Sequence, residues 1–120
     1  MARTFYRILA GASATRGDFL SHEALGRPLR RATSETRRTY DGVSIFETAN
    51  QARAVVKRAA RYRLLGTHIA AVTIPEDSPI RVRRTFLDQP GHYTVWGDPD
   101  DLLRCVTRIE PVAKPDEEQE

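Results

Sequence analysis

A chain of 120 residues, 40% of them hydrophobic, is expected to form one domain with a single core. No apolar run approaches the roughly 20 residues that span a bilayer, and the first residues lack the apolar core of a secretory signal. We therefore expect a cytoplasmic protein with no membrane partner. The single cysteine, Cys105, excludes an internal disulfide and a cysteine-cluster zinc site, and its apolar neighbours predict an unreactive core thiol.

The net charge of +3 is unevenly distributed along the chain. Four of the last five residues are acidic, so residues 1–113 are more basic than the total suggests. We predict a single α+β domain over 1–113 and a disordered acidic tail over 114–120. Nearly all the basic residues are arginine, which makes bidentate contacts to phosphate or carboxylate. A coding bias toward arginine is the simpler explanation of this preference.

The first quarter of the chain predicts one strand, one short helix and a long loop. Residues 4–9 have the composition of a strand. A short helix is expected near 18–25, where Asp18 or Ser21 could cap it and a glycine follows. The segment 27–41 has no sustained apolar period, and we predict a mobile loop there.

The next segment predicts a short strand that leads into the main helix. The strand covers residues 42–46, with Val43 and Ile45 on one face and Ser44 and Phe46 on the other. Thr48 and Gln51 form a capping box at the start of a helix over 49–65. Gly66 is expected to end this helix in the left-handed conformation.

The remaining elements are mostly strands. We predict strands at 67–74, at 80–86 as an edge strand, and at 92–96. Asp98 followed by proline predicts the start of a short helix over 99–103, and a last strand falls within 104–112. These elements favour a compact α+β domain with a mixed or antiparallel sheet.

Tyr6-Arg7 on a first strand, then Gly42-Val-Ser-Ile-Phe46 on a second strand and an alanine-rich helix, resembles the ADP-ribosyltransferase-like folds. These folds include small bacterial toxin and antibiotic-modifying branches. The resemblance implies that NAD is the substrate, that Tyr6 and Arg7 meet its nucleotide, and that Ser44 lines the nicotinamide-ribose site with Phe46 as a stacking wall. It covers most of residues 4–112 as an order of elements.

The family also places a glutamate or aspartate late in the fold, often in a Glu-x-Glu or Gln-x-Glu motif, and no such motif is present here. The nearest acids to the strand 92–96 are Asp88 and Asp98. The candidate catalytic residues are therefore Arg7, Ser44, Asp98 and His92, the last of which could take the place of the missing acid. A carboxylate at this position would stabilise an oxocarbenium-like transition state.

Each of these residues also has an ordinary structural interpretation. Arg7 could form a structural ion pair, Ser44 could bond a neighbouring strand, Phe46 could belong to the core, and Asp98 could serve as a helix cap. The three histidines lack the spacing of a metal site, so no metal is predicted.

Three functions follow from the sequence. The first is ADP-ribosyl transfer from NAD, or NAD glycohydrolysis, by a toxin-like domain that an antitoxin or target protein would contact. The second is a non-catalytic protein-binding scaffold of the same fold. The third is a nucleic-acid-binding module, in which the arginines of 27–38 and a helix surface formed by Arg53, Lys57, Arg58 and Arg61 would contact phosphates.

Overall fold

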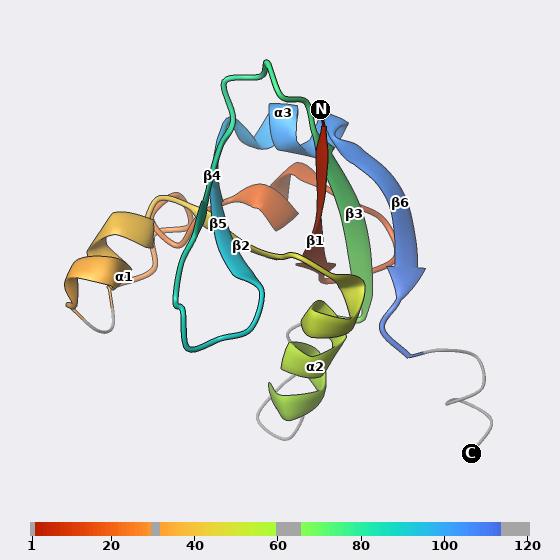
Figure 1. The fold of residues 1–120 in the computed structure, drawn as a ribbon, viewed down its shortest axis with the longest axis horizontal. Coiled ribbons are helices and arrows are strands. Elements are labelled where there is room, and N and C mark those ends of the chain that lie inside the picture. Colours follow the sequence, from red (N-terminus) through yellow and green to blue (C-terminus); the bar gives the residue numbers. More distant parts are fainter. Residues whose placement is uncertain (1, 30–31, 60–65, 114–120) are drawn as a thin grey trace.

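The computed structural model describes residues 2–29, 32–59 and 66–113 (Figure 1). The predicted tail 114–120 and the predicted helical residues 60–65 lie outside the described residues. The elements follow in the order β1 (Arg3–Leu9), a 3-10 helix η1 (Arg16–Phe19), α1 (Ser34–Thr39), β2 (Val43–Phe46), α2 (Ala49–Ala59), β3 (His68–Ile74), β4 (Arg81–Arg84), β5 (His92–Trp96), α3 (Pro99–Arg104) and β6 (Val106–Pro111).

The strands form one six-stranded sheet in the order β4-β5-β2-β1-β3-β6. Each pair of neighbouring strands is antiparallel. The fold is therefore α+β, which confirms the class predicted from the sequence, and β4 is an edge strand as expected. Figure 1 shows β1, β3 and β6 side by side on one side of the molecule and β2, β5 and β4 on the other.

The sheet is split between its two central strands, β1 and β2. β1 pairs with β3 from Arg3 opposite Ile74 to Leu9 opposite His68, but it pairs with β2 only where Tyr6 faces Phe46. β2 is short, and all of its residues pair with β5 instead. The two halves of the sheet therefore diverge next to this point, and side chains rather than a backbone ladder must fill the gap.

Apolar side chains cover both faces of the sheet. One cluster packs η1 and α3 against it through Phe5, Leu9, Phe19, Val43, Ile45, Ala70, Val72, Ile74, Val95 and Leu102. The other cluster packs α2 against the opposite face through Phe46, Ala52, Val56, Ile69 and Val112. Cys105 is only partly buried at the edge of the first cluster, and burial raises the pKa of its thiol, which is the direction expected for an unreactive cysteine.

The helix starts predicted at Thr48 and at Asp98 are confirmed. The Gln51 backbone N–H donates to Thr48 Oγ1 at 3.1 Å, and the Thr48 N–H donates to Gln51 Oε1 at 3.1 Å, which completes the capping box of α2. Asp98 Oδ1 accepts from the Asp100 N–H at 2.8 Å at the start of α3.

The short helix predicted near 18–25 is wrong. The helical turn is instead the 3-10 helix Arg16–Phe19, where Asp18 is the third residue of a capping box begun by Thr15. Residues 22–26 form turns, and Ser21 Oγ accepts from the Ala24 N–H at 3.1 Å. The capping residues were identified, but here they stabilise turns, because such side chains satisfy turn N–H groups as well as helical ones.

The segment 27–41 contains a helix, α1, where the sequence predicted only a loop. Thr33 Oγ1 accepts from the Thr36 N–H at 3.1 Å, and this capping box is the signal that the prediction missed. The helix buries no side chain completely, so it shows no apolar period.

The left-handed conformation predicted for Gly66 is also wrong, since its φ lies outside that region. Glycine is needed at this position for a different reason. A Cβ on Gly66 would overlap the Leu9 carbonyl oxygen, which already accepts from the Thr67 N–H at 3.0 Å. The absence of a side chain therefore lets the chain pass closely over the end of β1.

Candidate functional site

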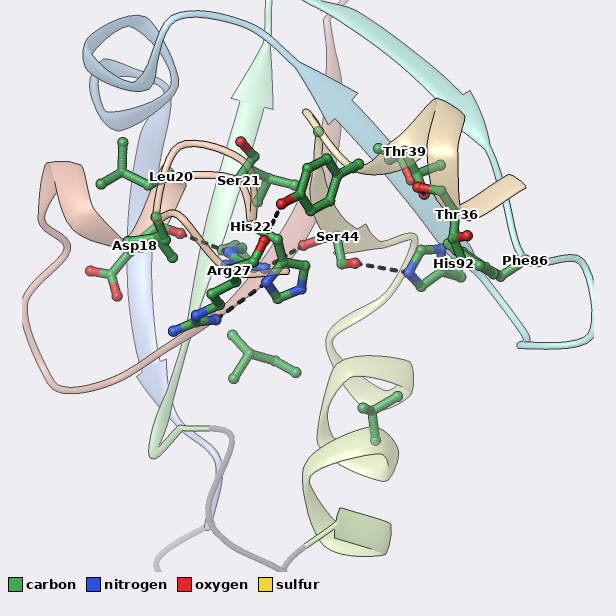
Figure 2. A pocket seen from close by; sticks show the side chains of 18 of the residues that line it. Asp18, Leu20, Ser21, His22, Arg27, Thr36, Thr39, Ser44, Phe86 and His92 are labelled. Carbon is green, nitrogen blue, oxygen red and sulfur yellow. Dashed lines mark hydrogen bonds between the residues drawn. The ribbon is translucent and has the colours of Figure 1, made fainter. Parts of the chain in front are cut away.

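A cleft of about 1100 Å³ opens where β1 and β2 diverge. Its walls come from the end of β1, the segment 17–29, α1, β2 and β5, together with the loop between β4 and β5. Figure 2 shows Ser44 between two groups of side chains, with Asp18, His22 and Arg27 on one side and His92, Phe86 and Thr36 on the other. Segments far apart in the sequence thus contribute to one cavity, as is typical of ligand sites.

Arg7 lines this cleft and connects its walls. By strand alternation it follows the face of Phe5 and Leu9, and where the strands diverge its guanidinium meets the backbone of β2. Nε donates to the Asp18 carbonyl oxygen at 2.9 Å, and Nη1 donates to the Ser44 carbonyl oxygen at 2.8 Å. Arg7 therefore supplies hydrogen bonds where the ladder between β1 and β2 is interrupted.

Burial lowers the pKa of Arg7 to about 10, although the negative charge of Asp18 acts in the opposite direction. The side chain is therefore still charged at neutral pH, and it is positioned in a partly desolvated setting. A cation held in this way attracts an anionic ligand more strongly than a fully hydrated one.

Ser44 and His92 are brought together by the pairing of β2 with β5. Phe46 faces His92 and Ser44 faces Thr94 across these strands, so Ser44 and His92 are diagonal neighbours on one face. The Ser44 hydroxyl lies 3.0 Å from His92 Nε2, and Ser44 is exposed to the cleft whereas His92 is buried. Arg7, Ser44 and His92 therefore all lie at one site.

Two phenylalanines hold the imidazole of His92. Phe46 meets it edge-on with ring centroids 5.4 Å apart, and Phe86 meets it from another side at 5.0 Å. Phe46 lines the cleft but is almost fully buried, so it acts as a wall and as part of the core. Phe86 was not predicted from the sequence as a residue of the site. Its φ of 49° is unusual for a residue with a side chain, and its N–H donates to Glu35 Oε2 at 2.8 Å.

Two other predicted site residues do not line the cleft. Tyr6 packs beside the cluster beneath α2. Asp98 caps α3, and the structure does not bring it to Arg7, Ser44 and His92. Tyr6 lies opposite Phe46 and packs against the cluster that contains it.

Of the carboxylates near His92, Asp88 was named from the sequence as one of the two acids nearest the strand 92–96, whereas Glu35 was not identified. Asp18 lines the cleft, but its Oδ2 accepts from the Thr15 N–H at 2.8 Å and from the Thr15 hydroxyl at 3.1 Å. Glu35 and Asp88 lie near enough to His92 to raise its pKa. Glu35 reaches this position because α1 packs next to the loop after β4, a contact that the sequence alone does not reveal.

The wall formed by residues 20–29 contributes a second arginine to the cleft. Arg27 Nη1 lies 3.3 Å from His22 Nδ1, and the Arg27 carbonyl oxygen accepts from the Tyr40 hydroxyl. The side chains of Arg27 and His22 both line the cavity (Figure 2). From the sequence, the arginines of this segment were predicted only to belong to a basic surface.

The basic helix surface predicted for nucleic-acid binding is reduced in the structure. Arg53 Nη2 donates to Glu110 Oε1 at 2.7 Å, and Arg53 Nε donates to the Val112 carbonyl oxygen at 3.2 Å. Its side chain is mostly buried by these contacts. Arg61, which was predicted to belong to the same surface, lies outside the described residues. Arg53 thus anchors α2 to the last strand.

Neither a metal site nor a membrane helix is found in the described ranges 2–29, 32–59 and 66–113. No group of three histidine, cysteine, aspartate or glutamate side chains there could hold a metal ion. Among the same residues, no helix has the length and apolarity to cross a membrane.

Comparison of the chain with protein-family models, with curated proteins and with solved structures finds no match. A function must therefore be argued from the contacts and chemistry of the cleft.

The buried imidazole of His92 is expected to make stability depend on pH. Burial lowers its pKa below the ordinary 6.5, whereas the Thr85 backbone, Glu35 and Asp88 raise it by less. The unfolded chain therefore takes up a proton near pH 6.5 and the folded one only at lower pH, so the free energy of unfolding falls as the pH drops below 6.5. The slope cannot exceed about 1.4 kcal/mol per pH unit.

Urea unfolding of the wild type and of His92→Gln, from pH 7 to about pH 5, measures this effect. Glutamine does not titrate, so the difference in unfolding free energy between the two proteins should shrink as the solution is acidified. A difference that is the same at every pH would contradict a lowered pKa for His92.

Proposed function

We propose that the cleft binds NAD and promotes cleavage of the bond between nicotinamide and ribose, with water or a second molecule as the acceptor. The observation that carries this proposal is the meeting of Arg7 and Ser44 in one cleft, where Arg7 Nη1 donates to the Ser44 carbonyl oxygen at 2.8 Å. These are the two residues that the family resemblance assigns to the nucleotide and to the nicotinamide ribose.

The size and charge of the cleft support a dinucleotide ligand. Small-molecule sites typically occupy about 300–1,000 Å³, and the volume of about 1100 Å³ lies just above this range. Arg7 and Arg27 both line the cavity, so two cations are available for the two charges of a pyrophosphate. The guanidinium donors of Arg7 that are not bonded to Asp18 and Ser44 can meet a phosphate oxygen.

The chemistry of the cleft also fits loss of nicotinamide. Departure of this neutral leaving group leaves positive charge on the ribose, which nearby negative charge stabilises. Glu35 and Asp88 act electrostatically on His92, so their negative potential extends to this wall of the cleft. A neutral His92 can take the proton of an attacking water or hydroxyl group. On this proposal, His92 takes over part of the role of the missing late glutamate.

Release of nicotinamide from NAD, measured by chromatography, tests this function. The wild type should release nicotinamide, and His92→Gln should do so about 100-fold more slowly, because general-base catalysis contributes at least about this factor. Leu87→Ala is a matched control, since Leu87 belongs to the same loop as Phe86 but is 70% exposed. Its rate should equal that of the wild type.

The remaining outcomes separate the alternatives. Binding of NAD without release of nicotinamide would favour a non-catalytic scaffold of the same fold. The absence of both binding and release would contradict the proposal.

A further inference from the structure

Polar burial in this protein is concentrated in one place. In the described part of the chain, the polar or charged residues that are more than nine-tenths buried are Thr85, His92 and Thr94, with exposures of 8%, 4% and 2%. His92 and Thr94 line the cleft beside Ser44, and Thr85 contacts both of them. Burying polar groups opposes folding unless they are paired, and these three pair with one another and with Ser44.

These side chains form one chain of hydrogen bonds that ends in the cleft. Thr85 Oγ1 lies 2.6 Å from Thr94 Oγ1 and 3.0 Å from His92 Nδ1. On the other side of the imidazole, His92 Nε2 lies 3.0 Å from the Ser44 hydroxyl. The hydrogen bonds therefore run from Thr85 to His92 and on to Ser44. Ser44 is exposed, whereas Thr85 and His92 are buried.

We assign the ring proton of His92 to Nδ1, on the side of Thr85. The Thr85 backbone raises the pKa of His92, as a carbonyl does when it accepts from the imidazole. With the proton on Nδ1, toward Thr85, the lone pair of Nε2 faces the Ser44 hydroxyl. Edge-on contacts from Phe46 and Phe86 fix the orientation of the ring.

We propose that Ser44 is an activated nucleophile, with His92 as its general base and Thr85 as the residue that positions His92, and that it accepts acyl groups from carboxylic esters. A serine within hydrogen-bond reach of a base, which a third group orients, is the recurring arrangement for such chemistry. This activity goes beyond cleavage of NAD and does not depend on it.

The proposed step balances without a metal or a redox partner. The Ser44 hydroxyl oxygen bonds to the ester carbonyl carbon, and its proton passes to His92 Nε2. The bond between that carbon and the alcohol oxygen then breaks, and the alcohol leaves with the proton from His92. Water repeats the sequence to release the carboxylic acid and to restore Ser44. The guanidinium of Arg7, bonded to the Ser44 backbone, is the cation available to the oxyanion.

A fluorophosphonate probe tests the nucleophile directly. In this reaction the serine oxygen bonds to phosphorus, fluoride leaves, and the proton passes to the base. Mass spectrometry of digested protein should find the label on Ser44. Ser21 is an internal control, because it lines the same cleft but bonds the Ala24 N–H instead of a histidine. Equal labelling of Ser21 and Ser44, or no label on Ser44, would overturn the proposal.

Variants then test the role of each partner. Labelling and hydrolysis of p-nitrophenyl acetate should be lost in Ser44→Ala and should slow by about 100-fold in His92→Gln. Thr85→Val removes the positioning hydroxyl with little change in shape, so labelling and hydrolysis should slow. Thr85→Ser keeps a hydroxyl and should restore the rate. Unchanged labelling in a folded His92→Gln protein would overturn the assignment of His92 as the base. If His92→Gln does not fold, unchanged labelling in Thr85→Val would overturn the assignment of Thr85 as the positioning residue.

The pH profile separates this role from a purely structural one. Labelling of the wild type should stay constant near neutral pH and should fall only in acid, when His92 gains a proton beside Glu35 and Asp88. A rate that instead follows hydroxide concentration throughout would indicate an ordinary, unactivated serine. Labelling without nicotinamide release would contradict the NAD proposal alone, and nicotinamide release without labelling would contradict this proposal alone.

Discussion

Replacing Arg7 with alanine is expected to weaken NAD binding by about 10- to 100-fold, because a hydrogen bond to a charged group contributes about 1.5–3 kcal/mol. The same change should lower the free energy of unfolding by about 2 kcal/mol, since the carbonyl oxygens of Asp18 and Ser44 lose their donor where the sheet is split. Calorimetric titration with NAD and urea unfolding measure the two effects separately.

Two further variants show whether the geometry of Arg7 matters or only its charge. Arg7→Lys keeps the charge but loses the planar fork that reaches both carbonyl oxygens, so it should restore only part of the affinity. Arg16→Ala removes a surface arginine whose ion pair with Asp100, at 3.2 Å, is more than half exposed. This control should bind NAD as the wild type does. Equal affinity in Arg7→Ala and Arg16→Ala would contradict a role for Arg7 in the site.

Replacing Gly66 with alanine should destabilise the fold by about 3 kcal/mol, at the upper end of the usual cost of overpacking. The added Cβ would overlap the Leu9 carbonyl oxygen, which is backbone and is held by its bond from the Thr67 N–H. Neither atom can move without disturbing β1, β3 or both. Urea unfolding at 25 °C measures the change.

Gly11→Ala is the matched control for this position. Gly11 lies just after β1, and a Cβ there would meet no atom within 4 Å. Its unfolding free energy should stay within about 0.5 kcal/mol of the wild type, as for other surface substitutions. Equal stability of the two variants would show that the chain does not pass closely over Leu9.

The strands could be predicted from the sequence where local composition and burial agree. The strand His92–Trp96 was predicted with its observed bounds, because aromatic and β-branched residues alternate between two turns. α3 begins where Asp98 and Pro99 indicated. α1 was missed because it packs no apolar stripe into the core, so only its threonine capping box marks it.

The site was predictable only in part, for a physical reason. Arg7, Ser44 and His92 were predicted from the sequence as candidate catalytic residues, and all three line the cleft. Thr85 and Glu35 could not be identified in the same way. Their roles depend on the register of β4 against β5 and on the position of α1, which are set by contacts between distant segments. Asp98 and Arg53, which the sequence offered as functional, are held by structural bonds instead.

The free energy of unfolding in the presence of NAD tests most directly whether NAD is the ligand of the cleft. A ligand that binds only the folded protein, at 100 times its dissociation constant, should stabilise it by about 2.7 kcal/mol. We predict a rise that grows with the logarithm of NAD concentration in the wild type and is much smaller in Arg7→Ala. An unfolding free energy that does not change with NAD would contradict the account.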